Sequence, residues 1–218
     1  MSDRPSAELR ARILGTAAEQ PALTRAQHRR HVMTVAALGA LATAALFFVM
    51  GGVQRGARPA EVVAFTGGLG AFAAIALTRG SGPVSVLGPP RHMLLLVGLL
   101  TTPALALVVL LAYTLWPVPP VHSVGPSSHV GCAAITVAQG GIPLLAFLIP
   151  RRGTDPVHPL LTGASLGVTA GAWSSMLAHL RCGHPGSEHA LAAHVLPVVF
   201  LALVGALLGR RLLSLRPS

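Results

Sequence analysis

The two cysteines of the chain, Cys132 and Cys182, are its most reactive side chains, because a thiolate can bind a metal ion or react with an oxidant. Each follows a histidine by three residues, in the strings His129-Val130-Gly131-Cys132 and His179-Leu180-Arg181-Cys182. Three residues is nearly one helical turn, so each histidine can share a helix face with its cysteine. Two thiolates and two imidazoles would make a tetrahedral ligand set for zinc or another soft or borderline metal.

More histidines lie around these two strings. His184 adds a Cys-x-His pattern, and His122, His189 and His194 are nearby in the sequence. The residue types leave three interpretations open: a sensor of metal or oxidants, a structural disulfide in an oxidising compartment, or interfacial residues with no special role. A membrane thiol oxidase is disfavoured, because its usual Cys-x-x-Cys pair is not present in the sequence.

The elements that position these residues are predicted to be membrane helices. Of the 218 residues, 52% are hydrophobic and only 10% are charged, whereas a soluble domain carries about 25% charged residues. Apolar stretches of this length form helices in lipid, because open backbone groups find no partner there. The fold class expected is therefore all-α, a polytopic bundle of six transmembrane helices over residues 32–50, 61–78, 92–115, 131–149, 159–180 and 190–209.

The distribution of arginine predicts the orientation of this bundle. All but three of the 16 basic residues fall in the two termini or in the loops after the second and fourth segments; the three are Arg55, Arg58 and Arg181. The excess marks the cytoplasmic side and places both termini there. We therefore expect a cytoplasmic partner-binding tail at 1–31, a transmembrane domain at 32–209 and a cytoplasmic tail at 210–218. The cysteines then lie at the periplasmic boundary.

The acidic residues argue against transport and catalysis. The sequence has six, and all lie at segment ends, in loops or in the N-terminal tail, so no carboxylate is expected in mid-membrane. Ion-coupled transport usually needs one. A phosphate-binding loop and a Ser-His-Asp arrangement are also missing from the sequence, so an enzyme is not expected. A transporter of a metal ion or small molecule remains the alternative function.

Glycines repeat at four-residue spacing in the last two segments. Gly163, Gly167 and Gly171 share one helix face, and Gly205 and Gly209 share another. Small residues at this spacing allow helices to approach closely. We expect packing within the bundle, with homodimerisation as the alternative.

The N-terminal tail contains a short amphipathic pattern. Leu9, Ile13 and Ala17 recur at four-residue spacing, with Leu14 beside them, while Arg10 and Arg12 lie mainly off this stripe. Ser6 is a suitable N-cap. Such a helix, which is marginal in water, suits either the groove of a partner or the surface of an anionic membrane.

Together these features resemble the NrsF-like membrane anti-sigma factors. The resemblance rests on Leu-Arg-Ala-Arg-Ile-Leu at 9–14, on Pro21-x-x-Thr24-Arg25, and on single cysteines at two external helix ends, Cys132 and Cys182. It implies an inner-membrane protein that holds an extracytoplasmic-function sigma factor on the cytoplasmic side, without contacting nucleic acid, and releases it on stress. Metal or oxidant acting at the two cysteines is implied as the signal. An anti-sigma factor triggered by light or singlet oxygen would have a similar architecture, so that stimulus stays an alternative. No cofactor would be required beyond a transient zinc-like or heavy metal ion. The candidate histidines His129, His179 and His184 come from spacing alone.

Overall fold

All regular elements in the described part of the chain are helices, which confirms the all-α class. The computed structural model describes residues 24–52, 90–96, 126–152, 157–182 and 187–214, and the single positions 8, 11, 15, 100, 101, 103, 104, 107 and 111. The elements follow in the order α2 (Arg25–Val49), α5 (Pro126–Leu148), the 3-10 helix η1 (Ile149–Arg151), α6 (Pro159–Arg181), α7 (Ser187–Ala190), the π-helix η2 (Leu191–Val195) and α8 (Leu196–Leu212).

Three helices of the described residues, not six, are long and apolar enough to cross a membrane: Ala26–Val49, His129–Arg151 and Ser187–Leu212. They correspond to the first, fourth and sixth predicted segments. The predicted segment 61–78 lies outside the described residues, and 92–115 is described only in part.

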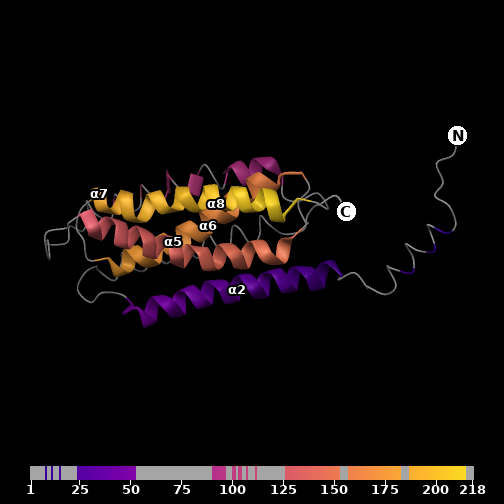
Figure 1. Ribbon diagram of the computed structural model, residues 1–218, viewed down its shortest axis with the longest axis horizontal. Helices are drawn as coiled ribbons and strands as arrows, with labels where there is room; N and C mark the ends of the chain where they lie inside the picture. Colours follow the sequence, from indigo (N-terminus) through magenta and orange to yellow (C-terminus); the bar gives the residue numbers. More distant parts are fainter. Residues whose placement is uncertain are drawn as a thin grey trace.

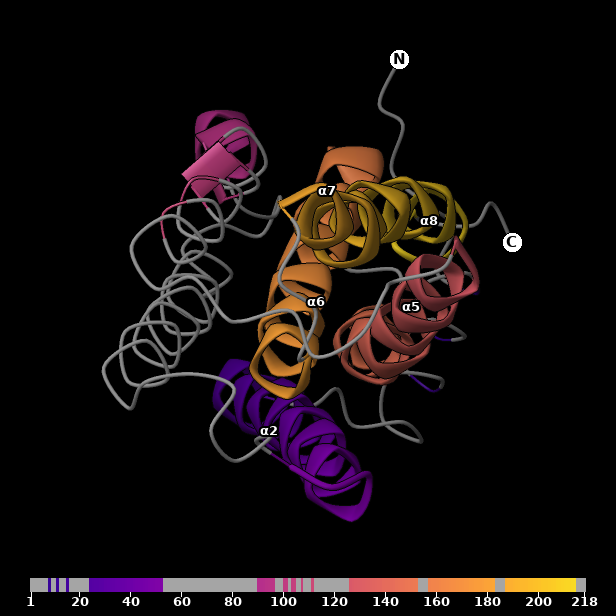
Figure 2. The ribbon, with the colours of Figure 1, turned by 90° about the vertical axis from the view of Figure 1, so that its left-hand side faces the viewer.

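The fifth predicted segment forms α6, a helix of 23 residues that is not one of these three. Its polar side chains are buried within the protein: Thr162, Ser165, Thr169, Ser174, Ser175 and His179. Viewed end-on, α6 lies in the middle of the described helices, with α8 and α2 on opposite sides and α5 beside it (Figure 2). A helix covered by neighbours needs no continuous apolar surface for lipid. The prediction of six spans is not met at this segment, because its glycine, serine and threonine residues lower its hydropathy.

A capping box starts α2 before its apolar stretch begins. The Gln27 backbone N–H donates to Thr24 Oγ1 at 3.2 Å, and the Thr24 N–H donates to Gln27 Oε1 at 2.9 Å. This reciprocal pair satisfies two backbone donors at the helix end. Arg29 and Arg30 are therefore helical and continuous with the first span. The predicted N-terminal helix, with Leu9, Arg10, Arg12, Ile13, Leu14 and Ala17, lies outside the described residues.

The glycine faces of α6 and α8 pack against each other, which confirms the predicted packing within the bundle. A methyl group at Gly163 would collide with the backbone of Gly205 and Gly209, and one at Gly167 would collide with Leu201 and Ala202. Such close backbone approach is typical of small-residue interfaces in membranes. On the other side of the bundle, Gly39 of α2 allows equally close contact with Ala146 of α5.

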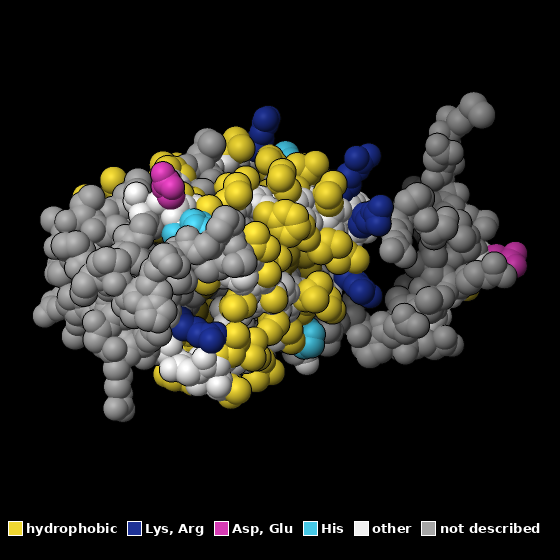
Figure 3. Space-filling model, turned by 60° about the vertical axis from the view of Figure 1, so that its left-hand side comes forward, with side chains coloured by type: hydrophobic (Ala, Val, Ile, Leu, Met, Phe, Trp, Pro, Cys, Tyr) yellow, Lys and Arg dark blue, Asp and Glu magenta, His cyan; other side chains and the backbone are white. Residues whose placement is uncertain are grey.

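The start of α2 and the end of α8 lie at one end of the bundle and α7 lies at the other (Figure 1). The paired glycines show that α6 and α8 are antiparallel, since Gly163 meets Gly209 and Gly171 meets Val198. Hydrophobic side chains cover much of the described surface on the face shown in Figure 3. The exposed large hydrophobic residues include Leu38, Leu41, Leu203 and Leu207. This architecture brings the start of α5 and the end of α6 together beside α7.

Candidate functional site

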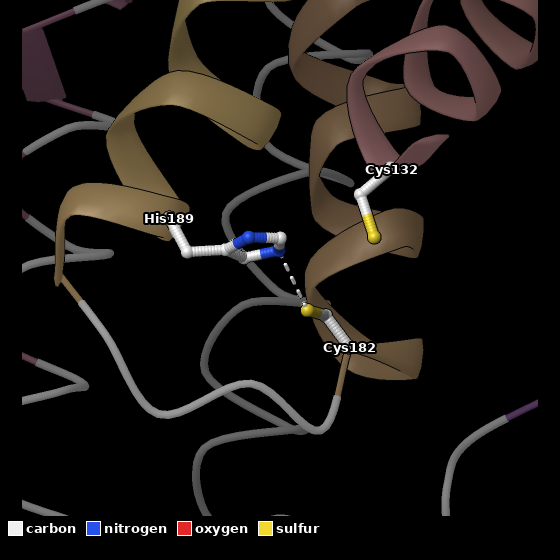
Figure 4. A group of neighbouring side chains, drawn as sticks. All are labelled: Cys132, Cys182 and His189. Carbon is white, nitrogen blue, oxygen red and sulfur yellow. Dashed lines mark hydrogen bonds between the residues drawn. The ribbon is translucent and has the colours of Figure 1, made fainter. Parts of the chain in front are cut away.

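Cys132, Cys182 and His189 form a cluster at the α7 end of the bundle (Figure 4). Their ligand atoms, the two Sγ atoms and a ring nitrogen, all lie within 4.8 Å of one another. The three side chains come from the start of α5, the end of α6 and the short helix α7. Cys132 is half-buried, whereas Cys182 is only 7% exposed and His189 2% exposed. The structure thus brings together two cysteines that are far apart in the sequence.

Within the cluster, the Sγ atom of Cys182 and the Nε2 atom of His189 lie 3.2 Å apart. Cys182 is the C-cap of α6, with φ −76° and ψ 118°. Its N–H still donates to the carbonyls of Ala178 and His179, and the bond to Ala178 has ordinary α-helical spacing. The chain therefore leaves the helical path only after Cys182. The two cysteines are thiols and are not joined in a disulfide.

His179 was predicted to act with Cys182, but the structure places it outside the three-residue cluster. Its buried ring packs instead against that of His194, with ring centroids 6.1 Å apart. A three-residue spacing places two side chains on neighbouring parts of a helix face but does not by itself bring them into contact, and the imidazole beside Cys182 Sγ is that of His189. His184 lies outside the described residues.

His129, predicted to act with Cys132, lies beside the cluster without being one of its three members. Its ring packs edge-on against the ring of His189, with centroids 4.7 Å apart. His189 in turn lies 5.5 Å from His194, so the rings of His129, His189, His194 and His179 form a row. The predicted gathering of histidines and cysteines at one end is confirmed for these residues.

His189 is the member of the cluster that sequence spacing did not select. It follows Cys182 after a short connection, and helices joined by short connections are neighbours at the same end of a bundle. The short connection between Cys182 and His189, rather than the spacing of residues within one helix, is the sequence signal that would have identified His189.

A π-helical turn directly follows α7, which carries His189, and connects it to α8. Within this turn the Leu196 N–H donates to the carbonyl of Leu191, five residues back. Pro197 comes next, and it cannot donate to the carbonyl of Ala193, which is its acceptor in an α-helix. The Thr136 hydroxyl lies 3.1 Å from that carbonyl and 2.8 Å from the carbonyl of Cys132. Thr136 therefore links the start of α5 to the π-turn.

Chemically, two thiols and one imidazole support two kinds of reaction. They can bind a thiophilic metal ion, or the thiols can be oxidised to a disulfide across α5 and α6. Both reactions would join helices that the structure holds together only by packing and hydrogen bonds at this end.

The described residues define an all-helical protein with three helices able to cross a membrane and a thiol–imidazole cluster at one end. The chain belongs to the NrsF family, negative regulator of sigma F, whose model matches residues 16–214. Membership of this family makes the protein a negative regulator of a sigma factor. No curated protein and no solved structure matches the chain.

Proposed function

We propose that this protein is an anti-sigma factor of the bacterial inner membrane. It holds an extracytoplasmic-function sigma factor through its N-terminal tail and releases it when a metal ion or an oxidant acts at Cys132 and Cys182. The family match supports the regulatory role. The observation that carries the signalling role is the convergence of Cys132, Cys182 and His189 from three separate helices.

The arrangement of the helices supports separate sites for the signal and for the partner at opposite ends of the bundle. The start of α2 and the end of α8 lie at one end, and the thiol cluster lies beside α7 at the other (Figure 1). Arg29 and Arg30 begin α2, and Arg210 and Arg211 end α8, so basic residues mark the terminal end. With the positive-inside rule, that end is cytoplasmic and the cysteines face the periplasm. The signal and the partner are then on opposite sides of the membrane.

The contacts of α5 can carry a structural change from the cysteine end of the bundle to α2. Cys132 lies near the start of α5, and Ala146 near its end packs against Gly39 of α2. α2 begins at the Thr24 capping box and is preceded by the N-terminal tail. Joining Cys132 to Cys182 would constrain α5 relative to α6, and α5 can pass this change to α2. The ligand shifts the equilibrium only by its difference in affinity between the holding and releasing states.

The experiment that tests sigma-factor binding uses the full-length protein recovered from membranes in detergent. We expect a sigma factor to co-purify, and the double substitution Leu9→Glu/Ile13→Glu to reduce the retained amount at least about tenfold. Burial of each such side chain is worth about 1.5–3 kcal/mol, and about 1.4 kcal/mol corresponds to tenfold in affinity. Glu19→Gln, in the same tail but off the apolar stripe, is the control and should retain the sigma factor normally.

Two results would contradict the proposal. The intact protein could retain no sigma factor, or the double variant could retain as much as the parent protein. In the second case the predicted apolar stripe would not be the binding surface.

A further inference from the structure

We propose that Cys132, Cys182 and His189 together form a three-ligand site for a thiophilic divalent metal ion, with His189 as a direct ligand. The metal binding stands on the geometry of the cluster. Its consequence for signalling rests on the proposed function, because the same cysteines are the proposed point of signal entry.

The spacing of the three ligand atoms is close to that of a metal site. Zinc–sulfur bonds of about 2.3 Å and zinc–nitrogen bonds of about 2.0–2.1 Å, at tetrahedral angles, place sulfurs about 3.8 Å apart and sulfur and nitrogen about 3.6 Å apart. All three atoms already lie within 4.8 Å of one another, and Cys182 Sγ lies 3.2 Å from His189 Nε2. Changes of about 1.2 Å or less in these separations therefore suffice, which is within the reach of side-chain rotation. Three protein ligands leave one tetrahedral position for water.

The charges of the ligand set balance a divalent ion. Binding replaces two thiol protons by the metal, so that M²⁺ and two thiols give a neutral dithiolate complex and two released protons. The imidazole donates a lone pair without changing the charge. A neutral complex suits this site, because Cys182 and His189 are 7% and 2% exposed, and an uncompensated charge is costly to bury. Sulfur and imidazole ligands favour zinc-like and softer ions over Mg²⁺ and Ca²⁺, which prefer oxygen.

The surroundings of His189 hold its ring in the cluster. The rings of His129 and His194 lie 4.7 Å and 5.5 Å away from it. The π-turn that starts two residues later is tied to α5 by the hydrogen bond from Thr136 to Ala193. The backbone that carries His189 is thereby linked to the helix that carries Cys132.

A metal site accounts for the position of His189 better than a disulfide does. A disulfide requires a sulfur–sulfur bond of about 2.05 Å and uses no third ligand. It would also remove the thiol that His189 contacts at 3.2 Å. Metal coordination uses all three side chains at once.

The test is metal titration of the reduced full-length protein in detergent, with Co²⁺ as the spectroscopic probe and Cd²⁺ as the competitor. We expect one Co²⁺ per chain, with visible d–d bands and a thiolate charge-transfer band that Cd²⁺ abolishes. His189→Ala should weaken Co²⁺ binding about 100-fold or more, since loss of even an outer-sphere partner of a metal ligand costs about 10–100-fold. His92→Ala, at an exposed histidine, should bind as the parent protein does.

His189→Cys separates loss of a ligand from loss of structure. A thiolate at this position restores a metal ligand, so we expect tight binding to return with a stronger charge-transfer band. The inference is overturned if His189→Ala binds Co²⁺ as tightly as the parent protein, or if His189→Cys binds as weakly as His189→Ala while both unfold at the parent temperature. It is also overturned if peroxide forms the disulfide readily and the reduced protein binds no metal.

Measuring sigma-factor retention in the same preparations distinguishes the two proposals. A protein that binds Co²⁺ through His189 but retains no sigma factor supports the metal site and contradicts the proposed function. A protein that retains its sigma factor, while its metal binding is independent of His189, contradicts this inference alone.

Discussion

Thr136 offers a quantitative test of how the π-turn is stabilised. We expect Thr136→Val, which keeps the shape of the side chain and removes the hydroxyl, to destabilise the protein by about 1–2 kcal/mol. Hydrogen bonds between membrane helices average about 0.6 kcal/mol and reach about 1.7. A buried group left without its partner costs about 1–3 kcal/mol. The carbonyl of Ala193 lies on a fully buried residue and lacks its ordinary α-helical donor, because Pro197 has no N–H to replace the Thr136 hydroxyl.

Thr43→Val is the matched control. The Thr43 hydroxyl is also fully buried and also donates to a carbonyl, that of Gly39, at 2.9 Å. Gly39 lies four residues earlier in α2, so its carbonyl keeps the ordinary helical donor when the hydroxyl is removed. We therefore expect this substitution to cost no more than about 0.5 kcal/mol. The comparison isolates the effect of Pro197 from the general cost of a threonine-to-valine change.

The assay is reversible unfolding of the full-length protein in mixed micelles, with the free energy of unfolding compared among variants. Pro197→Ala completes a double-mutant cycle, because alanine restores an N–H that can donate to Ala193. In that background Thr136→Val should cost about as little as Thr43→Val. Equal costs for Thr136→Val and Thr43→Val in the parent protein would refute the reasoning, and so would an unchanged cost of Thr136→Val in the Pro197→Ala background.

Two further predictions concern the helix interface and the thiols. Gly205→Leu should destabilise the protein by at least about 1–3 kcal/mol in the same assay, because the new side chain would meet the backbone of Gly163 and Gly167. The control is Gly141→Ala, which should be neutral because Gly141 faces open space. Equal effects of the two substitutions would contradict the packing. Cys132→Ser and Cys182→Ser should each abolish metal- or oxidant-induced expression of a sigma-dependent reporter at unchanged protein levels in the membrane. Retained induction would exclude the sensor role, and loss of protein from the membrane would indicate a structural role.

Local patterns in the sequence were sufficient for much of the fold. The apolar stretches at 131–149 and 190–209 lie within α5 with η1 and within the helices from α7 to α8, and the glycine repeats identified the α6–α8 interface. The start of α2 was not predicted, because the first segment was expected to begin at residue 32, although Thr24 and Gln27 have the spacing of a capping box. Each of these features depends on residues a few positions apart, so it can be recognised in a single sequence.

The candidate site was only partly predictable, because it depends on the ends of three helices. Both cysteines were identified from their reactivity and their expected side of the membrane. The partner histidine was not, since helical spacing favoured His179, whereas the imidazole beside Cys182 is that of His189 on the following helix. The π-turn before Pro197 depends on a hydrogen bond to Thr136, 57 positions away from Ala193, and no periodicity within one helix reports such a contact.

The central position of α6 has a consequence for how the protein is made. Its glycine face is covered by α8, its polar side chains are buried, and it is not one of the three helices that are long and apolar enough to cross a membrane. α8 is synthesised after α6, so the glycine face of α6 is covered only when the last span has arrived. We expect a released chain truncated after residue 186 to leave α6 accessible to water-soluble labelling reagents, and the full-length chain to protect it.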